Sequence, residues 1–87
     1  MKKSNSQSDR VIKVGREVKG RGGKAVSIIR GVPLESSELK QLSSELKKYC
    51  GTGGSVRGRE IVIQGDQRDI IVSLLREKGY KVIKAGG

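Results

Sequence analysis

With 87 residues the chain is long enough for one small domain, and the absence of Phe and Trp means that its core must be aliphatic. Its net charge of +10 is typical of a domain that meets nucleic acid or an anionic membrane, and we favour nucleic acid over a membrane or a merely solvated surface. It has no His, which removes the commonest general base and the commonest metal ligand. Cys50 is its single cysteine, which excludes an intrachain disulfide. We therefore expect no cofactor, no metal and no catalysis.

The first residues, 1–9, contain two lysines but no apolar run, and we expect a disordered tail before a domain that spans 10–87. No segment is apolar enough for a signal peptide or a membrane span, so we expect a cytoplasmic monomer. Alternating β-branched residues predict strands over 10–14 and 24–30, joined by a glycine-rich loop. Pro33 ends the second strand region because it cannot donate to a sheet.

Residues 35–50 are predicted to form a helix, because Leu39, Leu42, Leu46 and Tyr49 recur at three- and four-residue steps along one apolar stripe. Ser36 or Ser37 is the expected N-cap, and Gly51 is the expected stop. Cys50, at the helix end, is expected to be a small, partly buried residue rather than a reactive thiol.

A short strand is expected around Val56, followed by a strand over 59–65. Asp66 is then expected to cap a second helix, 67–79, with Gly79 as its stop and a last strand over 80–84. The inward positions predicted for this helix are Ile70, Ile71, Leu74 and Leu75.

The predicted order is β-β-α-β-β-α-β, and each helix is apolar on one side only. Two such helices can bury their apolar sides by packing on one face of a sheet. We therefore predict an α+β domain, a two-layer α/β sandwich whose five-stranded sheet carries both helices on one face.

The glycine loops do not match phosphate sites of enzymes. A P-loop ending in Gly23-Lys24 would need a glycine at Val18 and a hydroxyl at Ala25. A dinucleotide pattern started at Gly51 fails at Val56. Asp66 and Asp69 are placed to offset the N-terminal dipole of the second helix rather than to act as an acid–base pair.

The loop after the first strand instead combines glycines with cations. Glycines let a backbone approach a phosphate closely, and the cations release counterions from RNA. Gly20 to Gly23 also matches the short KH-domain clamp, but its flanks are strands rather than helices, and two tyrosines are too few for an RNA-recognition motif. The predicted RNA-binding residues of this region are Arg16, Lys19, Arg21, Gly22, Gly23 and Lys24.

Four segments together resemble the bacterial and archaeal homologues of eukaryotic translation initiation factor 1. They are KGRGGKAVSIIRGV, LKKYCGTGGSVR, IVIQGDQRD and KGYKVIKAGG, and the resemblance runs from about Val11 to Gly87. The turn from Gly65 to Arg68 is the most specific of them.

The resemblance implies a factor that binds rRNA of the small ribosomal subunit near the peptidyl site and influences selection of the start codon and initiator tRNA, with contacts to that tRNA and mRNA. It gives the ribosome-facing role to Lys19, Arg21 and Lys24, and adds Gln67 and Arg68. Further RNA contacts are considered at Arg10, Lys13, Arg57 and Arg59. The alternatives left open are a ribosome-bound translation inhibitor or stress regulator and, from another class, a nucleotide-using enzyme.

Overall fold

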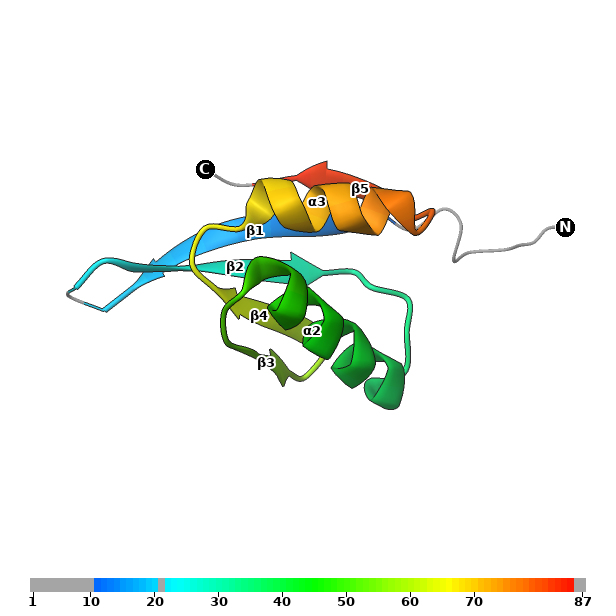
Figure 1. Ribbon diagram of the computed structural model, residues 1–87, viewed down its shortest axis with the longest axis horizontal. Coiled ribbons are helices and arrows are strands. Elements are labelled where there is room, and N and C mark those ends of the chain that lie inside the picture. Colours follow the sequence, from blue (N-terminus) through cyan, green and yellow to red (C-terminus); the bar gives the residue numbers. More distant parts are fainter. Residues whose placement is uncertain (1–10, 21, 86–87) are drawn as a thin grey trace, which may run out of the picture.

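The computed structural model describes residues 11–20 and 22–85 (Figure 1). The tail predicted over 1–9 and the candidate RNA contacts Arg10 and Arg21 lie outside the described residues. For Lys19, only the backbone is described.

Five strands form one mixed sheet in the order β3-β4-β2-β1-β5. The first and last strands of the chain, β1 and β5, are parallel, and the other neighbouring pairs are antiparallel. The strands span Val11–Lys19 (β1), Lys24–Arg30 (β2), Gly54–Arg57 (β3), Glu60–Gln64 (β4) and Lys81–Lys84 (β5).

The two helices, α2 (Ser36–Cys50) and α3 (Arg68–Glu77), cover the same face of the sheet (Figure 1). Helix α2 contacts β3 and β4, and α3 contacts β1 and β5. Strand alternation sends one side chain in two towards the helices, so the buried core combines one face of the sheet with the apolar helix stripes. The predicted α+β fold is confirmed. Fully buried members of this core include Ile12, Val14, Ile29, Leu39, Leu46, Ile61, Ile63, Ile71 and Leu75.

Helix α2 confirms the predicted stripe except at its end. Leu42 and Leu46 are buried, but Tyr49 is 59% exposed, because Cys50, four residues after Leu46, faces the core in the last turn instead. The N-cap is Glu35 rather than Ser36 or Ser37, and its backbone N–H donates to the Glu38 carboxylate at 3.2 Å. Gly51 ends the helix in the left-handed conformation, as predicted.

Helix α3 is shorter than the predicted 67–79 span, and its N-cap is Gln67 rather than Asp66. Ile70 was predicted to point inward but is 42% exposed, because it lies in the first turn on the side away from the sheet. Ile71, Leu74 and Leu75 are buried as predicted. In the part of the chain that the structure describes, no helix has the length and apolar character needed to cross a membrane.

Strand β1 continues to Lys19, five residues beyond the predicted end at 14. Arg16 and Lys19 therefore lie in the strand rather than in a loop, and the connection to β2 is reduced to residues 20–23. Gly20 and Gly23 have positive φ, and the Gly23 N–H donates to the Gly20 carbonyl at 3.3 Å. The glycine-rich segment is thus the tight tip of a long β-hairpin.

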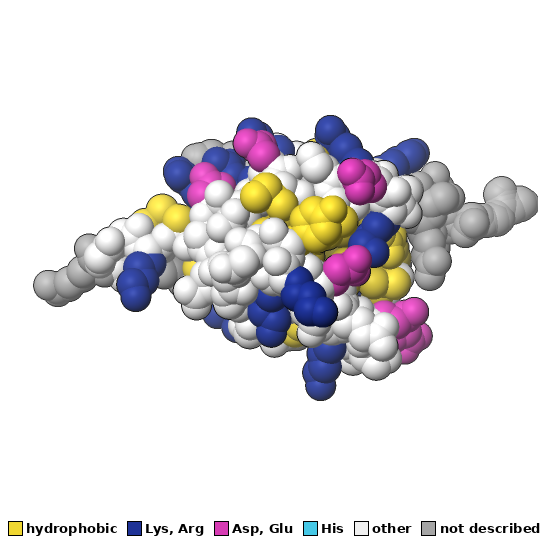
Figure 2. Space-filling model, viewed as in Figure 1, with side chains coloured by type: hydrophobic (Ala, Val, Ile, Leu, Met, Phe, Trp, Pro, Cys, Tyr) yellow, Lys and Arg dark blue, Asp and Glu magenta, His cyan; other side chains and the backbone are white. Residues whose placement is uncertain are grey.

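Figure 2 shows the face that carries the helices, where apolar side chains cross the middle and Lys and Arg side chains gather on both sides. The exposed large apolar residues of the described chain include Val18, Tyr49 and Ile70, on the hairpin and the two helices. Single exposed apolar residues are common on soluble proteins. An exposed Tyr ring is also a surface on which a nucleobase can stack.

Candidate RNA-binding surface

The β1–β2 hairpin extends beyond the rest of the sheet (Figure 1). Within the described residues, β1 pairs with β5 only from Val11 to Val14, and the β4 ladder on β2 begins at Val26. The last backbone bonds from the body are Ala85 N–H to the Val14 carbonyl and Gly65 N–H to the Ala25 carbonyl, both 2.8 Å. In the described part of residues 18–24, here called the hairpin tip, the backbone is therefore bonded to its own hairpin and not to the body.

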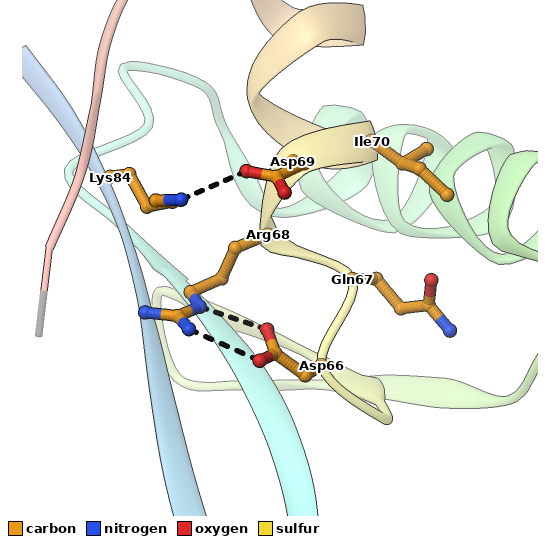
Figure 3. Close-up of a pocket in the computed structure, with 6 residues that line it drawn as sticks. All are labelled: Asp66, Gln67, Arg68, Asp69, Ile70 and Lys84. Carbon is orange, nitrogen blue, oxygen red and sulfur yellow. Dashed lines mark hydrogen bonds and ion pairs between the residues drawn. The ribbon is translucent and has the colours of Figure 1, made fainter. Parts of the chain in front are cut away.

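The turn between β4 and α3 lies at the base of this hairpin. Figure 3 shows a shallow hollow beside the turn, in which the Arg68 guanidinium faces the Asp66 carboxylate and Lys84 faces Asp69. Arg68 donates from Nε at 2.8 Å and from a terminal nitrogen at 3.1 Å, so the pair is bidentate. Lys84 donates to Asp69 at 3.0 Å. Two carboxylates and two cations line the hollow, and these charges are paired with one another.

The Asp66 carboxylate also meets the hairpin, since an Arg16 nitrogen on β1 lies 3.7 Å from it. Hydrogen bonds from the Arg68 side chain are the main cause that holds the pKa of Asp66 below its ordinary value, with smaller contributions from the Arg68 backbone N–H and the Arg16 charge. Asp66 was predicted to be a helix cap. Its carboxylate is instead chiefly the centre of an ion-pair cluster between two segments, because the N-cap position falls one residue later.

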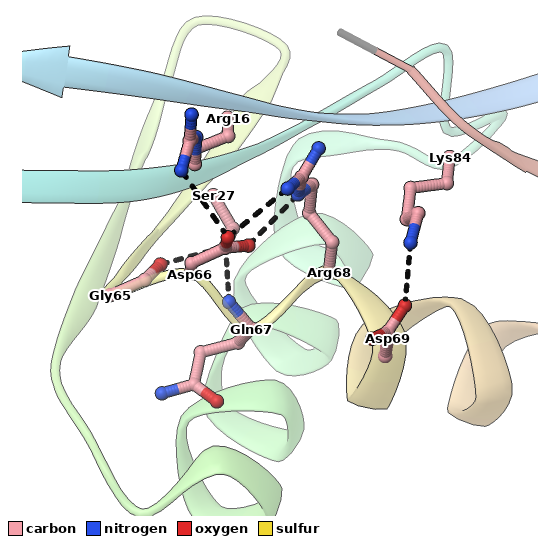
Figure 4. A network of polar contacts seen from close by, with 8 residues as sticks. All are labelled: Arg16, Ser27, Gly65, Asp66, Gln67, Arg68, Asp69 and Lys84. Carbon is pink, nitrogen blue, oxygen red and sulfur yellow. Dashed lines mark hydrogen bonds and ion pairs between the residues drawn. The ribbon is translucent and has the colours of Figure 1, made fainter. Parts of the chain in front are cut away.

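Ser27 of β2 makes hydrogen bonds to the same turn (Figure 4). Its hydroxyl donates to the Gly65 carbonyl and accepts from the Gln67 N–H, each at 2.8 Å, and the side chain is fully buried. Ser27 is the cross-strand partner of Arg16. The hydrogen bonds of Ser27 to the turn and the ion pair of Arg16 with the turn therefore lie side by side.

The structure brings part of the predicted RNA-binding set together. Arg16, Lys19, Gly22, Gly23 and Lys24 lie on the hairpin, with Lys19 paired to Lys24 next to the turn. Gln67 and Arg68 lie at its base. The Arg68 side chain is only 15% exposed and is engaged by Asp66, so its role as a direct RNA contact stays a prediction.

Three other candidates lie away from the tip. Lys13 pairs with Arg30, and Arg57 pairs with Glu60, both at the end of the sheet opposite the hairpin turn. Arg59 lies in the β3–β4 turn at that same end, where it donates to the Leu34 carbonyl at 2.8 Å. These residues and the hairpin tip do not form one surface.

The C-terminal end of α2 is a feature that the sequence analysis did not include in the site. It lies at the hairpin end of the molecule, because β3 follows it and begins opposite Ile63 near the end of β4. Lys47, Lys48 and the exposed Tyr49 occupy this last turn. The signal in the sequence was two adjacent lysines beside an aromatic residue, which the apolar stripe obscured.

Cys50 is partly buried against the core, as predicted. Burial raises the pKa of its thiol, which disfavours the nucleophilic thiolate.

Comparisons with known proteins identify the family of the chain. Residues 8–81 match the family model of translation initiation factor SUI1. The chain is 51% identical over 81 residues to the uncharacterized protein YciH of Escherichia coli K12, covering 93% of this chain and 75% of that protein.

Archaeal relatives are named protein translation factor SUI1 homologs. The one from Ignicoccus hospitalis is 41% identical over 70 residues, which covers 80% of this chain and 66% of the relative. The one from Sulfolobus acidocaldarius is 39% identical over 75 residues, which covers 86% of this chain and 75% of the relative. The family match and these identities extend over most of the chain, and the chain belongs to the SUI1 family of translation initiation factors.

Proposed function

We propose that this protein binds rRNA of the small ribosomal subunit near the peptidyl site and influences selection of the start codon and initiator tRNA. It acts as a cytoplasmic monomer and without catalysis. The observation that carries the proposal is the hairpin tip, a narrow, strongly basic ribbon that extends past the body of the domain.

Charge supports RNA as the ligand of the tip. Residues 10–30 contain seven basic residues and one acid, Glu17. Cations placed along a ribbon contact successive phosphates and release their counterions, which is the main source of affinity for an RNA backbone. The basic residues of this segment are Arg10, Lys13, Arg16, Lys19, Arg21, Lys24 and Arg30.

Space at the tip supports close backbone contact. A Cβ added at Gly22 would meet no atom within 4 Å, so the Gly22 backbone is open to a large ligand. A phosphate approaches such a backbone more closely than it approaches one that carries side chains. Gly22→Val is therefore expected to weaken RNA binding while the fold is retained.

The experiment is a binding comparison with purified small ribosomal subunits over a salt series. One variant replaces Lys19, Arg21 and Lys24 with Ala. The matched control replaces Lys13, Arg57 and Arg59, which removes the same charge from the opposite end of the sheet. Loss of bulk charge affects both variants equally, so a difference between them reports local contact.

We expect the tip variant to flatten the slope of log affinity against log salt by about 2–3 units, at about 0.7–0.9 per lost phosphate contact. The control variant should lose less affinity and keep most of the slope. Equal losses would assign the binding to overall charge, and a larger loss in the control would place the RNA surface at the other end of the sheet.

The effect on initiation needs a second measurement. In a reconstituted system, the protein is expected to lower the yield of initiation complexes on near-cognate start codons relative to AUG, and the tip variant should lose this discrimination. An equal reduction on every start codon would instead identify a general translation inhibitor.

A further inference from the structure

We infer that Asp66 is a positioning residue that sets the direction of the hairpin tip through Arg16 and Arg68, with Ser27 as its neutral counterpart. This inference rests on the proposed function, since the tip is the element that is oriented. Asp66 and Arg68 lie in the turn before α3, and Arg16 and Ser27 lie on the hairpin strands.

The position of these contacts along the hairpin is the first argument. An isolated two-stranded ribbon is only marginally stable and bends easily, so its direction is set by the last point at which the body holds it. On β2, this last point is formed by the hydrogen bonds between the turn and Ala25 and Ser27. On β1, it is formed by the ion pair between Asp66 and Arg16. Both strands are thereby anchored to one turn.

The sign of the charge is the second argument. A carboxylate at the base of a phosphate-binding ribbon lowers the local positive potential, which by itself weakens RNA binding. Asp66 also takes up one guanidinium of the basic surface, because Arg68 donates two hydrogen bonds to it. The Asp66 carboxylate repels RNA, and its presence beside the hairpin is explained if its contacts hold the hairpin tip in place.

The geometry of Arg68 is the third argument. Its planar guanidinium engages both oxygens of the Asp66 carboxylate, at 2.8 Å and 3.1 Å, and this fixes the rotation of the carboxylate facing Arg16. A lysine supplies the same charge as a point and does not fix a carboxylate in this way. Arg68 therefore acts here through its shape as well as through its charge.

The test compares Asp66→Asn with Asp69→Asn, which removes the same charge from the first turn of α3 at a residue paired with Lys84. Arg68→Lys is compared with Arg76→Lys in the last turn of the same helix. Two quantities are measured for each folded variant: residual dipolar couplings of the amides of residues 18–24 in the free protein, and affinity for small ribosomal subunits across a salt series.

We expect Asp66→Asn and Arg68→Lys to change the couplings of the tip relative to the body. Both should weaken binding several-fold and flatten the salt slope by about 1 unit, which corresponds to about one phosphate contact. Asp66→Asn should do so although it makes the protein more positive. The controls should keep wild-type couplings and slope, and Asp69→Asn should bind as well as the wild type or better.

The inference is overturned if Asp66→Asn keeps the wild-type couplings, whether or not binding changes, or if the couplings change while affinity does not fall. If the wild type itself fails to bind the subunit, the proposed function falls. The couplings then still decide whether Asp66 orients the tip.

Discussion

The sandwich body and the hairpin tip are held together in different ways. In the body, aliphatic side chains from β1, β2, β4, β5 and both helices are buried together, and Val56 of β3 is partly buried against them. Leu39, Leu46 and Ile61 are fully buried. In the tip, Val18 is 56% exposed, and the described backbone is bonded within the hairpin. Packing therefore fixes the shape of the body, whereas the direction of the tip depends on a few polar contacts at its base. The two regions should respond differently to the same kind of mutation.

The largest contrast is expected from truncation of an apolar side chain. Leu46→Ala leaves a cavity beneath α2 and should lower the free energy of unfolding by about 2–5 kcal/mol. Val18→Ala in the tip should change it by less than about 0.5 kcal/mol, because that side chain is mostly in solvent. Urea unfolding curves measure both. Similar midpoints for the two variants would show that the tip contributes to a shared core.

Glycines should give the second contrast. A Cβ at Gly54 on β3 would overlap the Val62 carbonyl oxygen and lie 2.9 Å from Cδ1 of Ile63, so the sheet must shift to admit it. Gly54→Ala should cost about 1–3 kcal/mol. Gly22→Ala, in open space at the tip, should cost less than about 0.5 kcal/mol. Thermal melts measure both variants, and a lower melting temperature for Gly22→Ala than for Gly54→Ala would contradict this account.

The smallest effect is expected from pH at the junction of the two regions. The pKa of Asp66 is lowered in the folded protein, so its ion pairs stabilise the fold fully above the ordinary carboxyl pKa of 3.8 and are lost as pH falls through the lower, folded value. Asp66 is exposed enough for water to screen the pairs, so the effect should be small. The difference in melting temperature between wild type and Asp66→Asn should shrink in acid. A constant difference from neutral to acid pH would show that the charge is not the cause.

The body was largely predictable from the sequence, because burial follows apolar periodicity. Leu42 and Leu46 are buried as their spacing predicted, whereas Tyr49 is exposed because the inward position of the last turn is that of Cys50, four residues after Leu46. The end of β1 was misplaced because Gly15 and Arg16 interrupt its apolar pattern, although cross-strand hydrogen bonds continue to Lys19.

The junction was not predictable, because it depends on residues far apart in the chain. The local pattern at Asp66 resembles a helix cap, and Arg16, its partner on β1, is distant in sequence. Ser27 gave a weak signal, as a lone hydroxyl within the apolar run of β2. Burial alone predicts that such a hydroxyl needs a partner but does not identify Gly65 or Gln67.

The parallel pairing of β1 with β5 has a consequence for biosynthesis. Ile12 pairs with Val82, so the pairing of β1 with β5 brings together residues that are far apart in the sequence. Such a distant contact costs more loop-closure entropy than a hairpin and forms late in folding. The β1–β2 hairpin can form while the chain is still being synthesised, but one edge of β1 stays unpaired until the last strand has emerged. The sheet is therefore complete only after the segment that forms β5 has been synthesised and has paired with β1.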